Sequence, residues 1–121
     1  MKKELKEKWI EALRSGDYPQ TSNHLCDETG WCCLGVLCDL VDSSKWIYDD
    51  SDETEEGAKT YSFGNMHSKE FPSATWLWNV GLNYNLAKKL ADMNDDGAFT
   101  FEDIANTIQE EVYSDDNEIR H

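Results

Sequence analysis

The chain has 121 residues and carries 25 Asp and Glu against 11 Lys and Arg, which gives a formal net charge of −14 at pH 7. Such a charge repels nucleic acid and anionic lipid, so it argues against both as partners and favours basic proteins or cations, although solubility alone also explains it. Five Trp, five Tyr and four Phe exclude wholesale disorder, and the length suits one domain with its own core.

An amphipathic helix is predicted at the N-terminus. Leu5, Trp9 and Leu13 form an apolar stripe at helical spacing, and Gly16 supplies a stop. Acidic residues interrupt the opening MKKELKEKWIEAL, so it does not resemble a secretory signal. The longest apolar run, at 31–38, is too short to cross a bilayer. We therefore expect a cytoplasmic protein with no membrane attachment.

A hairpin and a buried helix are predicted next. The turn formers DETG at 27–30 join segments around 20–26 and 31–33 into a small hairpin. The segment CCLGVLCDLV (32–41) has helical apolar spacing, and Gly35 within it marks a close approach of two backbone segments. The predicted core-facing residues of this helix are Leu34, Leu37, Cys38 and Val41.

The middle of the chain is acidic and has little periodicity. KWIY at 45–48 favours a short strand, and the run DDSDETEE at 49–56 places six acids in eight residues. Because no apolar period follows, residues 49–70 are predicted to be an irregular acidic insertion.

Three helices are predicted in the last third of the chain. Pro72 suits a first helical turn, and Gly81 suits a helix end. Leu86, Leu90 and Met93 form the apolar stripe of the next helix. The stripe of the last helix consists of Phe101, Ile104, Ala105, Ile108 and Val112.

These elements predict an α+β fold that is mainly α. We expect a single compact domain, residues 1–113, of four or five helices with one small β-hairpin. The last two helices form an antiparallel pair turned by residues 94–100. Residues 114–121 are predicted to be a frayed acidic tail.

The stretch DMNDDGAFTFED at 92–103 matches the ligand spacing of an EF-hand loop. Such a loop takes oxygen ligands at positions 1, 3, 5, 7, 9 and 12, with Gly at position 6, and Gly97 is sixth here. An aspartate at position 12, Phe99 at position 8 and the lack of a second loop weaken the match. A calcium or magnesium site would use the side chains of Asp92, Asn94, Asp96, Thr100 and Asp103, with the Ala98 carbonyl.

The same residues are also accounted for without a metal. Thr100 is a good N-cap for the last helix, and Asp103 at its third position completes a capping box. Asn94 and Gly97 are ordinary turn residues between two helices. An ion site and a capped turn therefore both remain open as interpretations of this stretch.

Three blocks of the sequence resemble a known family. KWIEALRSGDYPQ, CCLGVLCDL and LADMNDDGAFTFEDIANTI are similar to blocks in a family of small bacteriophage and prophage proteins. The resemblance covers residues 1–42 and 72–112, and the acidic stretch between them is this chain's own. It implies a phage-encoded accessory protein made in the bacterial host cytoplasm, and it brings no established activity. In the family pattern, the Asn, Asp, Gly and Phe of the loop belong to a helical turn.

Outside residues 92–103, the sequence contains little evidence for a metal site or a catalytic site. The spacing C-x5-C-C-x4-C is not a usual zinc pattern, so we expect reduced, buried cysteines, with a site of His24, Cys26 and Cys32 as the remaining alternative. The chain has no phosphate-binding glycine loop, no G-x-S-x-G and no H-E-x-x-H. We therefore expect no catalytic activity.

Three functional hypotheses follow. The first is a non-catalytic accessory protein that modulates a basic host protein, for example one of host defence, through Asp49, Asp50, Asp52, Glu53, Glu55 and Glu56. The second is the ion-binding module at 92–103. The third is a small-molecule or nucleotide binder, which would need converging lysines for phosphate. Its groove would be lined by Trp46, Tyr48, Trp76 and Trp78, although core packing accounts for these aromatic residues as well.

Overall fold

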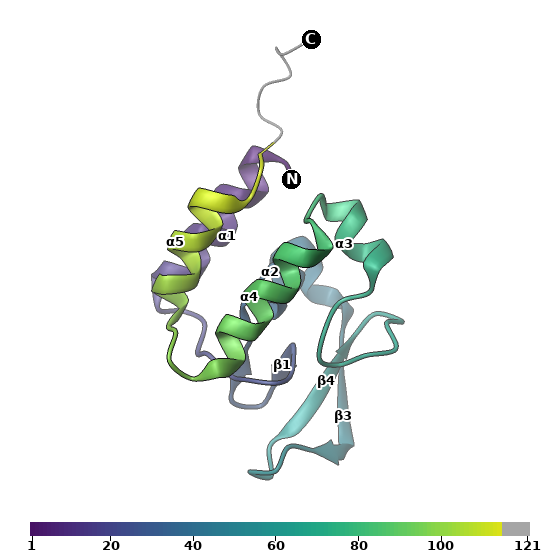
Figure 1. The fold of residues 1–121 in the computed structure, drawn as a ribbon. Coiled ribbons are helices and arrows are strands. Elements are labelled where there is room, and N and C mark those ends of the chain that lie inside the picture. The colour runs from purple at the N-terminus through teal and green to yellow at the C-terminus, as the bar shows by residue number, and fades with distance from the viewer. Residues whose placement is uncertain (115–121) are drawn as a thin grey trace.

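Helices make up one end of the molecule, and a β-sheet projects from the other (Figure 1). The computed structural model describes residues 1–114, and within them it contains five α-helices, one 3-10 turn and a four-stranded sheet. This is the predicted, mainly helical α+β fold; residues 115–121 of the predicted tail lie outside the described residues. The elements are α1 (Lys3–Ser15), β1 (Cys26–Asp27), β2 (Gly30–Trp31), α2 (Cys33–Asp42), η1 (Ser43–Lys45), β3 (Trp46–Glu53), β4 (Lys59–Phe63), α3 (Ala74–Val80), α4 (Tyr84–Asp96) and α5 (Phe101–Glu111).

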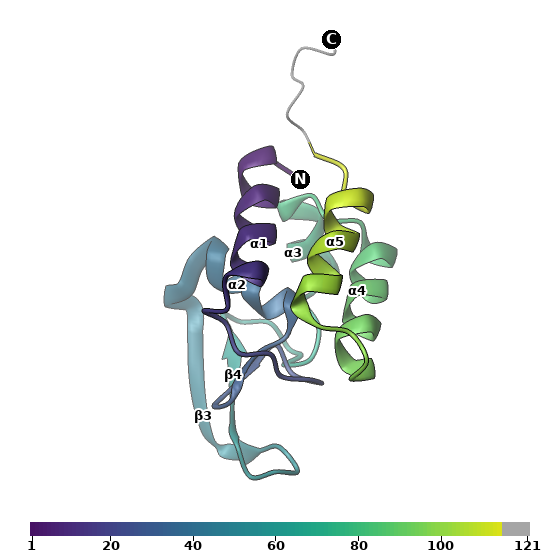
Figure 2. The same cartoon turned by 90° about the vertical axis from the view of Figure 1, so that its left-hand side faces the viewer.

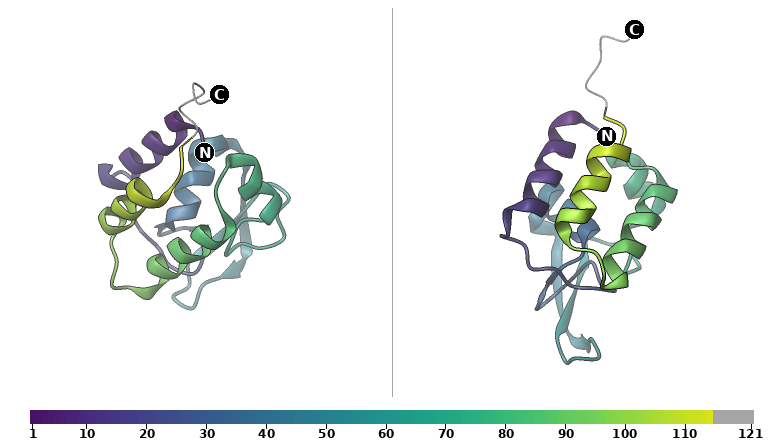
Figure 3. Two further views of the ribbon diagram at one scale, coloured as in Figure 1. Left: turned by 45° about the horizontal axis from the view of Figure 1, so that its top comes forward. Right: turned by 60° about the vertical axis from the view of Figure 1, so that its left-hand side comes forward.

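Helix α2 lies at the centre of the core, with the other helices around it (Figure 3). All residues from 33 to 38 are buried. Trp9 of α1 is fully buried against this helix, and its indole Nε1 donates a hydrogen bond to the carbonyl of Cys33 at 2.9 Å. Three of the four predicted core residues of α2 are buried. Val41 is 41% exposed instead, because the last turn of α2 is only partly covered.

Helices α1 and α5 lie side by side (Figure 2). Helix α1 ends at Gly16 in a left-handed conformation, as predicted. Polar contacts join the two helices at their edges, since Lys6 Nζ donates to the carbonyl of Val112 at 2.8 Å and Arg14 pairs with Glu102 at 3.0 Å. The whole predicted stripe of the last helix is buried: Phe101, Ile104, Ala105, Ile108 and Val112.

The predicted first hairpin is present but short. Strands β1 and β2 pair antiparallel, with Cys26 opposite Trp31. Gly35 is the close approach that the sequence predicted, because a Cβ atom there would lie 1.8 Å from the carbonyl oxygen of Leu25. Only glycine lets α2 pack this closely against the segment that enters the hairpin.

The prediction of an irregular insertion at residues 49–70 was wrong for residues 49–53 and 59–63, whereas 54–58 and 64–70 form no helix or strand. Much of this segment forms β3 and β4, and the sheet order β2-β1-β4-β3 makes β3 an edge strand. Acids are poor strand formers, but an edge strand tolerates them because one side faces solvent. A register shift between Asp49 and Glu53 also breaks the alternation by which a strand is recognised.

The last three helices follow their capping signals. Helix α3 has Ser73 as its N-cap, so Pro72 lies outside the helix and not in its first turn. Helix α4 ends at Gly97, and α5 then returns antiparallel to α4 (Figure 1). The predicted capping box of Thr100 and Asp103 at the start of α5 is confirmed.

Candidate functional site

Residues 92–103 form a helix end and a capped turn. Helix α4 continues through Asp96, whereas the first half of an EF-hand loop must leave the helix so that its ligands converge on the ion. Thr100 and Asp103 accept hydrogen bonds from each other's backbone N–H groups. Within residues 1–114 no group of three or more His, Cys, Asp or Glu is placed to hold a metal ion. Neither the calcium loop nor the zinc alternative fits this geometry.

Asn94 faces the protein interior. It is 1% exposed, and its Oδ1 accepts hydrogen bonds from the N–H of Cys33 at 3.1 Å and from Nε2 of Gln20 at 3.2 Å. Its Nδ2 donates to the carbonyl of Thr21 at 2.8 Å. Asp92, earlier on α4, is exposed. Asn94 therefore joins α4 to the start of α2 and to the loop that precedes β1.

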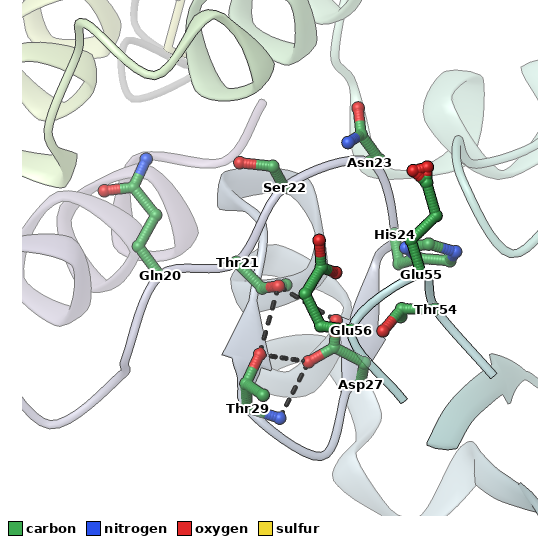
Figure 4. Close-up of a pocket in the computed structure, with 10 residues that line it drawn as sticks. All are labelled: Gln20, Thr21, Ser22, Asn23, His24, Asp27, Thr29, Thr54, Glu55 and Glu56. Carbon is green, nitrogen blue, oxygen red and sulfur yellow. Dashed lines mark hydrogen bonds between the residues drawn. The ribbon is translucent and has the colours of Figure 1, made fainter. Parts of the chain in front are cut away.

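That loop, residues 20–24, forms one wall of a polar pocket (Figure 4). Asp95 also fixes it, because Oδ1 of Asp95 accepts a hydrogen bond from the backbone N–H of Asn23 at 2.8 Å. Asn23 has a φ of 69°, a left-handed conformation that asparagine tolerates better than most residues. Two side chains of α4 thus position a loop about seventy residues earlier in the sequence.

Asp27, at the end of β1, lines the pocket from the first hairpin. It is 5% exposed, and burial of a carboxylate is unfavourable unless donors surround it. Its carboxylate accepts hydrogen bonds from Thr21 Oγ1 at 2.9 Å, Thr29 N–H at 2.7 Å, Thr29 Oγ1 at 2.5 Å and Gly30 N–H at 3.2 Å (Figure 4). These donors hold the carboxylate in place in the pocket wall.

The tip of the β3–β4 hairpin supplies the facing wall. The backbone N–H of Thr54 donates to the carbonyl of Ala58 at 2.8 Å, and Gly57 takes a φ of 89° to close the turn. Glu55 and Glu56 stand exposed on this turn. Both line the pocket together with Thr54 (Figure 4).

The pocket has a volume of about 550 Å³, and none of the Lys and Arg residues that the structure describes lines it. Its walls present hydroxyl, amide, imidazole and carboxylate groups. Nδ1 of His24 is buried and has no hydrogen-bond partner among the described residues. In a neutral imidazole protonated at Nε2, this nitrogen accepts hydrogen bonds. Acceptors therefore dominate the pocket, which suits a cationic ligand with several N–H donors.

Half of the predicted contact acids are used in ion pairs within the protein. Lys69 Nζ lies 2.7 Å from Asp49 Oδ2 and 3.0 Å from Asp52 Oδ2. These hydrogen bonds lower the pKa of both carboxyls and raise the pKa of Lys69. Glu53 forms an ion pair with Lys59. The predicted contact acids that are exposed and form no ion pair among the described residues are Asp50, Glu55 and Glu56.

The aromatic residues predicted to line one groove lie in different places. Trp46 and Trp76 both pack edge-on against Phe63, with ring centroids 4.8 and 6.1 Å from it. Tyr48 is 48% exposed on the edge strand, and Trp78 is 83% exposed on α3. No common groove forms among these described residues, and half of the set belongs to packing around Phe63.

The lysines do not converge in the way that the nucleotide hypothesis requires. Lys59 and Lys69 pair with carboxylates of β3, and Lys89 pairs with Glu111 of α5. Since no Lys or Arg among residues 1–114 lines the polar pocket, the pocket offers no ammonium or guanidinium group to a phosphate.

All four cysteines lie within the described residues, and they are buried and free. Burial raises the pKa of the Cys26 and Cys32 thiols to about 12 and the pKa of Cys33 and Cys38 well above the usual range. Cys32 caps α2, since its Sγ accepts the N–H of Gly35 at 3.3 Å. These thiols serve packing and capping, as the sequence predicted for reduced cysteines.

A family model described as a domain of unknown function, DUF8296, matches residues 1–112. The chain belongs to this family. The match includes every helix and strand described above, so the polar pocket lies inside the DUF8296 domain. No curated protein and no solved structure matches the chain. Within residues 1–114, no helix is both long and apolar enough to span a membrane.

Sequence reasoning on this DUF8296 chain missed Thr21, Asp27 and Thr29 as site residues. The segment DETG was correctly predicted to form a turn, but the position of the Asp27 carboxylate in a pocket wall was not predicted. A signal was present, because an Asp two residues before a Thr in a turn commonly accepts that residue's N–H. Here the N–H of Thr29 makes that bond. Glu55 and Glu56, in contrast, are distant from Asp27 in the sequence, and only folding brings all three into the lining of one pocket.

Proposed function

We propose that this protein is a non-catalytic binding protein that recognises a basic segment of a partner protein, with one Arg or Lys side chain of the partner entering the polar pocket. The observation that carries the proposal is the composition of the pocket. Asp27, Glu55 and Glu56 line it, whereas no Lys or Arg of the described residues does. In a pocket of this composition a cationic side chain is the complementary group.

The acceptors of the pocket favour arginine in particular. A guanidinium carries five N–H donors in a planar fork, which match carboxylates and neighbouring acceptors together. The exposed carboxylates of Glu55 and Glu56 provide two such acceptors at the rim. The hydroxyl of Thr54, which also accepts the N–H of Ala58 at 3.1 Å, provides a further one.

The charge of the whole protein supports the same class of partner. A net charge of −14 raises the association rate of proteins with basic surfaces and disfavours the binding of acidic proteins. Lys69 and Lys59 offset part of the charge along β3, so the unpaired charge is concentrated toward the hairpin tip. Together with the resemblance to phage accessory proteins, this leads us to propose a host protein with a basic surface as the partner, in the bacterial cytoplasm.

A peptide titration tests the proposal. Fluorescence anisotropy of a labelled hexa-arginine peptide is followed with the wild type and with Glu55→Gln/Glu56→Gln. We expect the pocket variant to weaken binding about ten-fold, which corresponds to about 1.4 kcal/mol. The matched control is Glu7→Gln/Glu11→Gln, which removes the same charge from exposed positions of α1.

The two variants separate pocket recognition from the general field of the protein. If both variants weaken peptide binding equally, the loss of affinity is due to net charge alone, and this result would contradict the pocket proposal. Binding should also weaken between about 50 and about 300 mM salt, because exposed charges are screened over that range. A complex insensitive to salt would contradict an acidic recognition surface.

A further inference from the structure

Helix α3 and the N-terminus lie at the end of the molecule away from the tip of the β3–β4 hairpin (Figures 1 and 2). Residues of both line a second hollow. Its volume is about 620 Å³. Its walls include Leu77, Leu82 and the aromatic rings of Trp78, Tyr84 and Tyr113, and no acidic residue of the described part of the chain, 1–114, lines it. This hollow therefore contrasts with the polar pocket, which Asp27, Glu55 and Glu56 line.

Backbone packing builds the floor of this hollow. Helix α3 ends at Gly81 with a φ of 81°, and a Cβ atom at that position would lie 2.8 Å from the N and Cα atoms of Met1. The N-terminus therefore packs directly under the turn between α3 and α4. Leu77 and Leu82, on either side of that turn, are almost fully buried.

Aromatic side chains project from the rim. Trp78 is 83% exposed, Tyr84 is 50% exposed and Tyr113 is 62% exposed. Burial of an indole is strongly favourable, so a tryptophan exposed to this extent beside an apolar hollow is typical of a contact surface. The same face thus carries both a projecting group and a cavity.

We propose that two copies of this chain associate through this face, with Trp78 of each copy entering the hollow of the other. A two-fold contact uses the same patch on both subunits, so the patch must be complementary to itself. A face that combines a projecting Trp78 with an adjacent apolar hollow meets that requirement. A binding site for an unrelated ligand would require only the hollow and not the exposed tryptophan beside it.

Electrostatics favour this face over the acidic hairpin for contact with a second copy. Each copy carries a net charge of −14, and the mutual repulsion is smallest where carboxylates are absent from the contact. Pairing through the α3 end keeps the two acidic hairpins far apart (Figure 1). It also leaves the polar pocket open, so this inference stands independently of the proposed function.

The contact is small, so the dimer should be of modest strength. Three aromatic rings bury on the order of 500 Å² per copy, which is less than the roughly 800 Å² per partner of a standard interface. We therefore expect dissociation on the order of micromolar concentration. Because salt screens the repulsion between two acidic copies, the dimer should strengthen as salt rises. An interface held by ion pairs would weaken instead.

Sedimentation velocity of the full chain, from about 1 to about 500 μM and at low and high salt, tests the proposal. The wild type should show a monomer–dimer equilibrium, and Trp78→Ser should weaken it by about ten-fold or more. Ile47→Ser is the matched control, because Ile47 is a 53% exposed apolar residue on β3. Circular dichroism confirms the fold of each variant, and Tyr84→Ser is a second variant on the same face.

Three results would overturn the proposal. The first is a wild type that remains monomeric at every concentration and salt. The second is a dimer that Ile47→Ser weakens as much as Trp78→Ser does, which would place the contact on the edge strand. The third is a dimer that Trp78→Ser and Tyr84→Ser leave as strong as that of the wild type, which would place the contact outside this face.

Discussion

Asn94 accepts a hydrogen bond from the backbone N–H of Cys33, with an Oδ1–N distance of 3.1 Å across 61 residues of sequence. This N–H belongs to the first turn of α2, where backbone donors have no partner within the helix. The same side chain donates to the carbonyl of Thr21. One amide therefore connects three segments, and it does so from the sequence position where a calcium loop would carry a ligand.

Replacing Asn94 by Ala should strongly destabilise the protein. The change leaves buried donors and acceptors of α2 and the loop without partners, and each such group costs about 1–3 kcal/mol. We expect the free energy of unfolding to fall by about 2–4 kcal/mol, measured by urea denaturation. Asp92→Ala, at an exposed position of the same helix, should change it by less than about 0.5 kcal/mol.

The wild type and Asp92→Ala together test the EF-hand interpretation. A calcium titration of the chelator-stripped wild type should leave the melting temperature unchanged up to about 1 mM, the range of weak sites. A saturable rise in melting temperature that Asp92→Ala abolishes would restore the ion-site hypothesis.

Gly35→Ala should prevent normal folding. Its Cβ atom would meet the backbone carbonyl of Leu25 at 1.8 Å, and backbone in a buried core cannot move aside cheaply. We expect a loss of at least about 3 kcal/mol, visible as a large fall in the denaturation midpoint. Gly16→Ala serves for comparison, since nothing lies within 4 Å of its Cβ position. It should cost only the left-handed strain of about 1 kcal/mol.

The ion pairs of Lys69 with Asp49 and Asp52 should make the stability of the protein depend on pH. Hydrogen bonds from Lys69 lower the pKa of Asp49 and Asp52. The two carboxylates therefore stabilise the folded protein fully above the ordinary carboxyl pKa, and this stabilisation is lost as pH falls through the lowered values. At the alkaline end the raised pKa of Lys69 keeps its contribution until the pH passes that raised value.

Lys69→Met tests this dependence. Thermal melts should show the variant less stable than the wild type at pH 7, with the difference shrinking below about pH 4. Lys8→Met removes the same charge from an exposed position of α1 and should show no such convergence. A difference that stays constant down to about pH 2 would mean that packing of the Lys69 stem, and not the ion pairs, is responsible.

The thiols should be almost unreactive in the native protein. With the pKa of Cys26 and Cys32 raised to about 12 by burial, the reactive thiolate at pH 8 is about a thousand-fold scarcer than in a free thiol. Labelling with a maleimide reagent should therefore be slow in buffer and fast in denaturant, with mass spectrometry as the readout. A single cysteine that reacts rapidly in the native state would point to an accessible thiol and contradict the burial described here.

The sequence by itself determined the helical part of this protein. The stripe of α5, the stop at Gly16 and the capping box of Thr100 with Asp103 are signals within one or two helical turns. Helix formation depends on contacts at that range, and for this reason these predictions are confirmed. The close approach at Gly35 was also visible in the sequence, because glycine is unfavourable inside a helix unless a neighbouring backbone segment leaves no room for a side chain.

Only the tertiary structure decided which polar residues share a site. The walls of the polar pocket come from residues 20–24, from Asp27 and Thr29, and from residues 54–56, and two side chains of α4 hold the first of these walls. Strand β3 likewise exists because β4 pairs with it and Lys69 offsets its charge. Such contacts depend on chain closure over many residues, and no local periodicity records them.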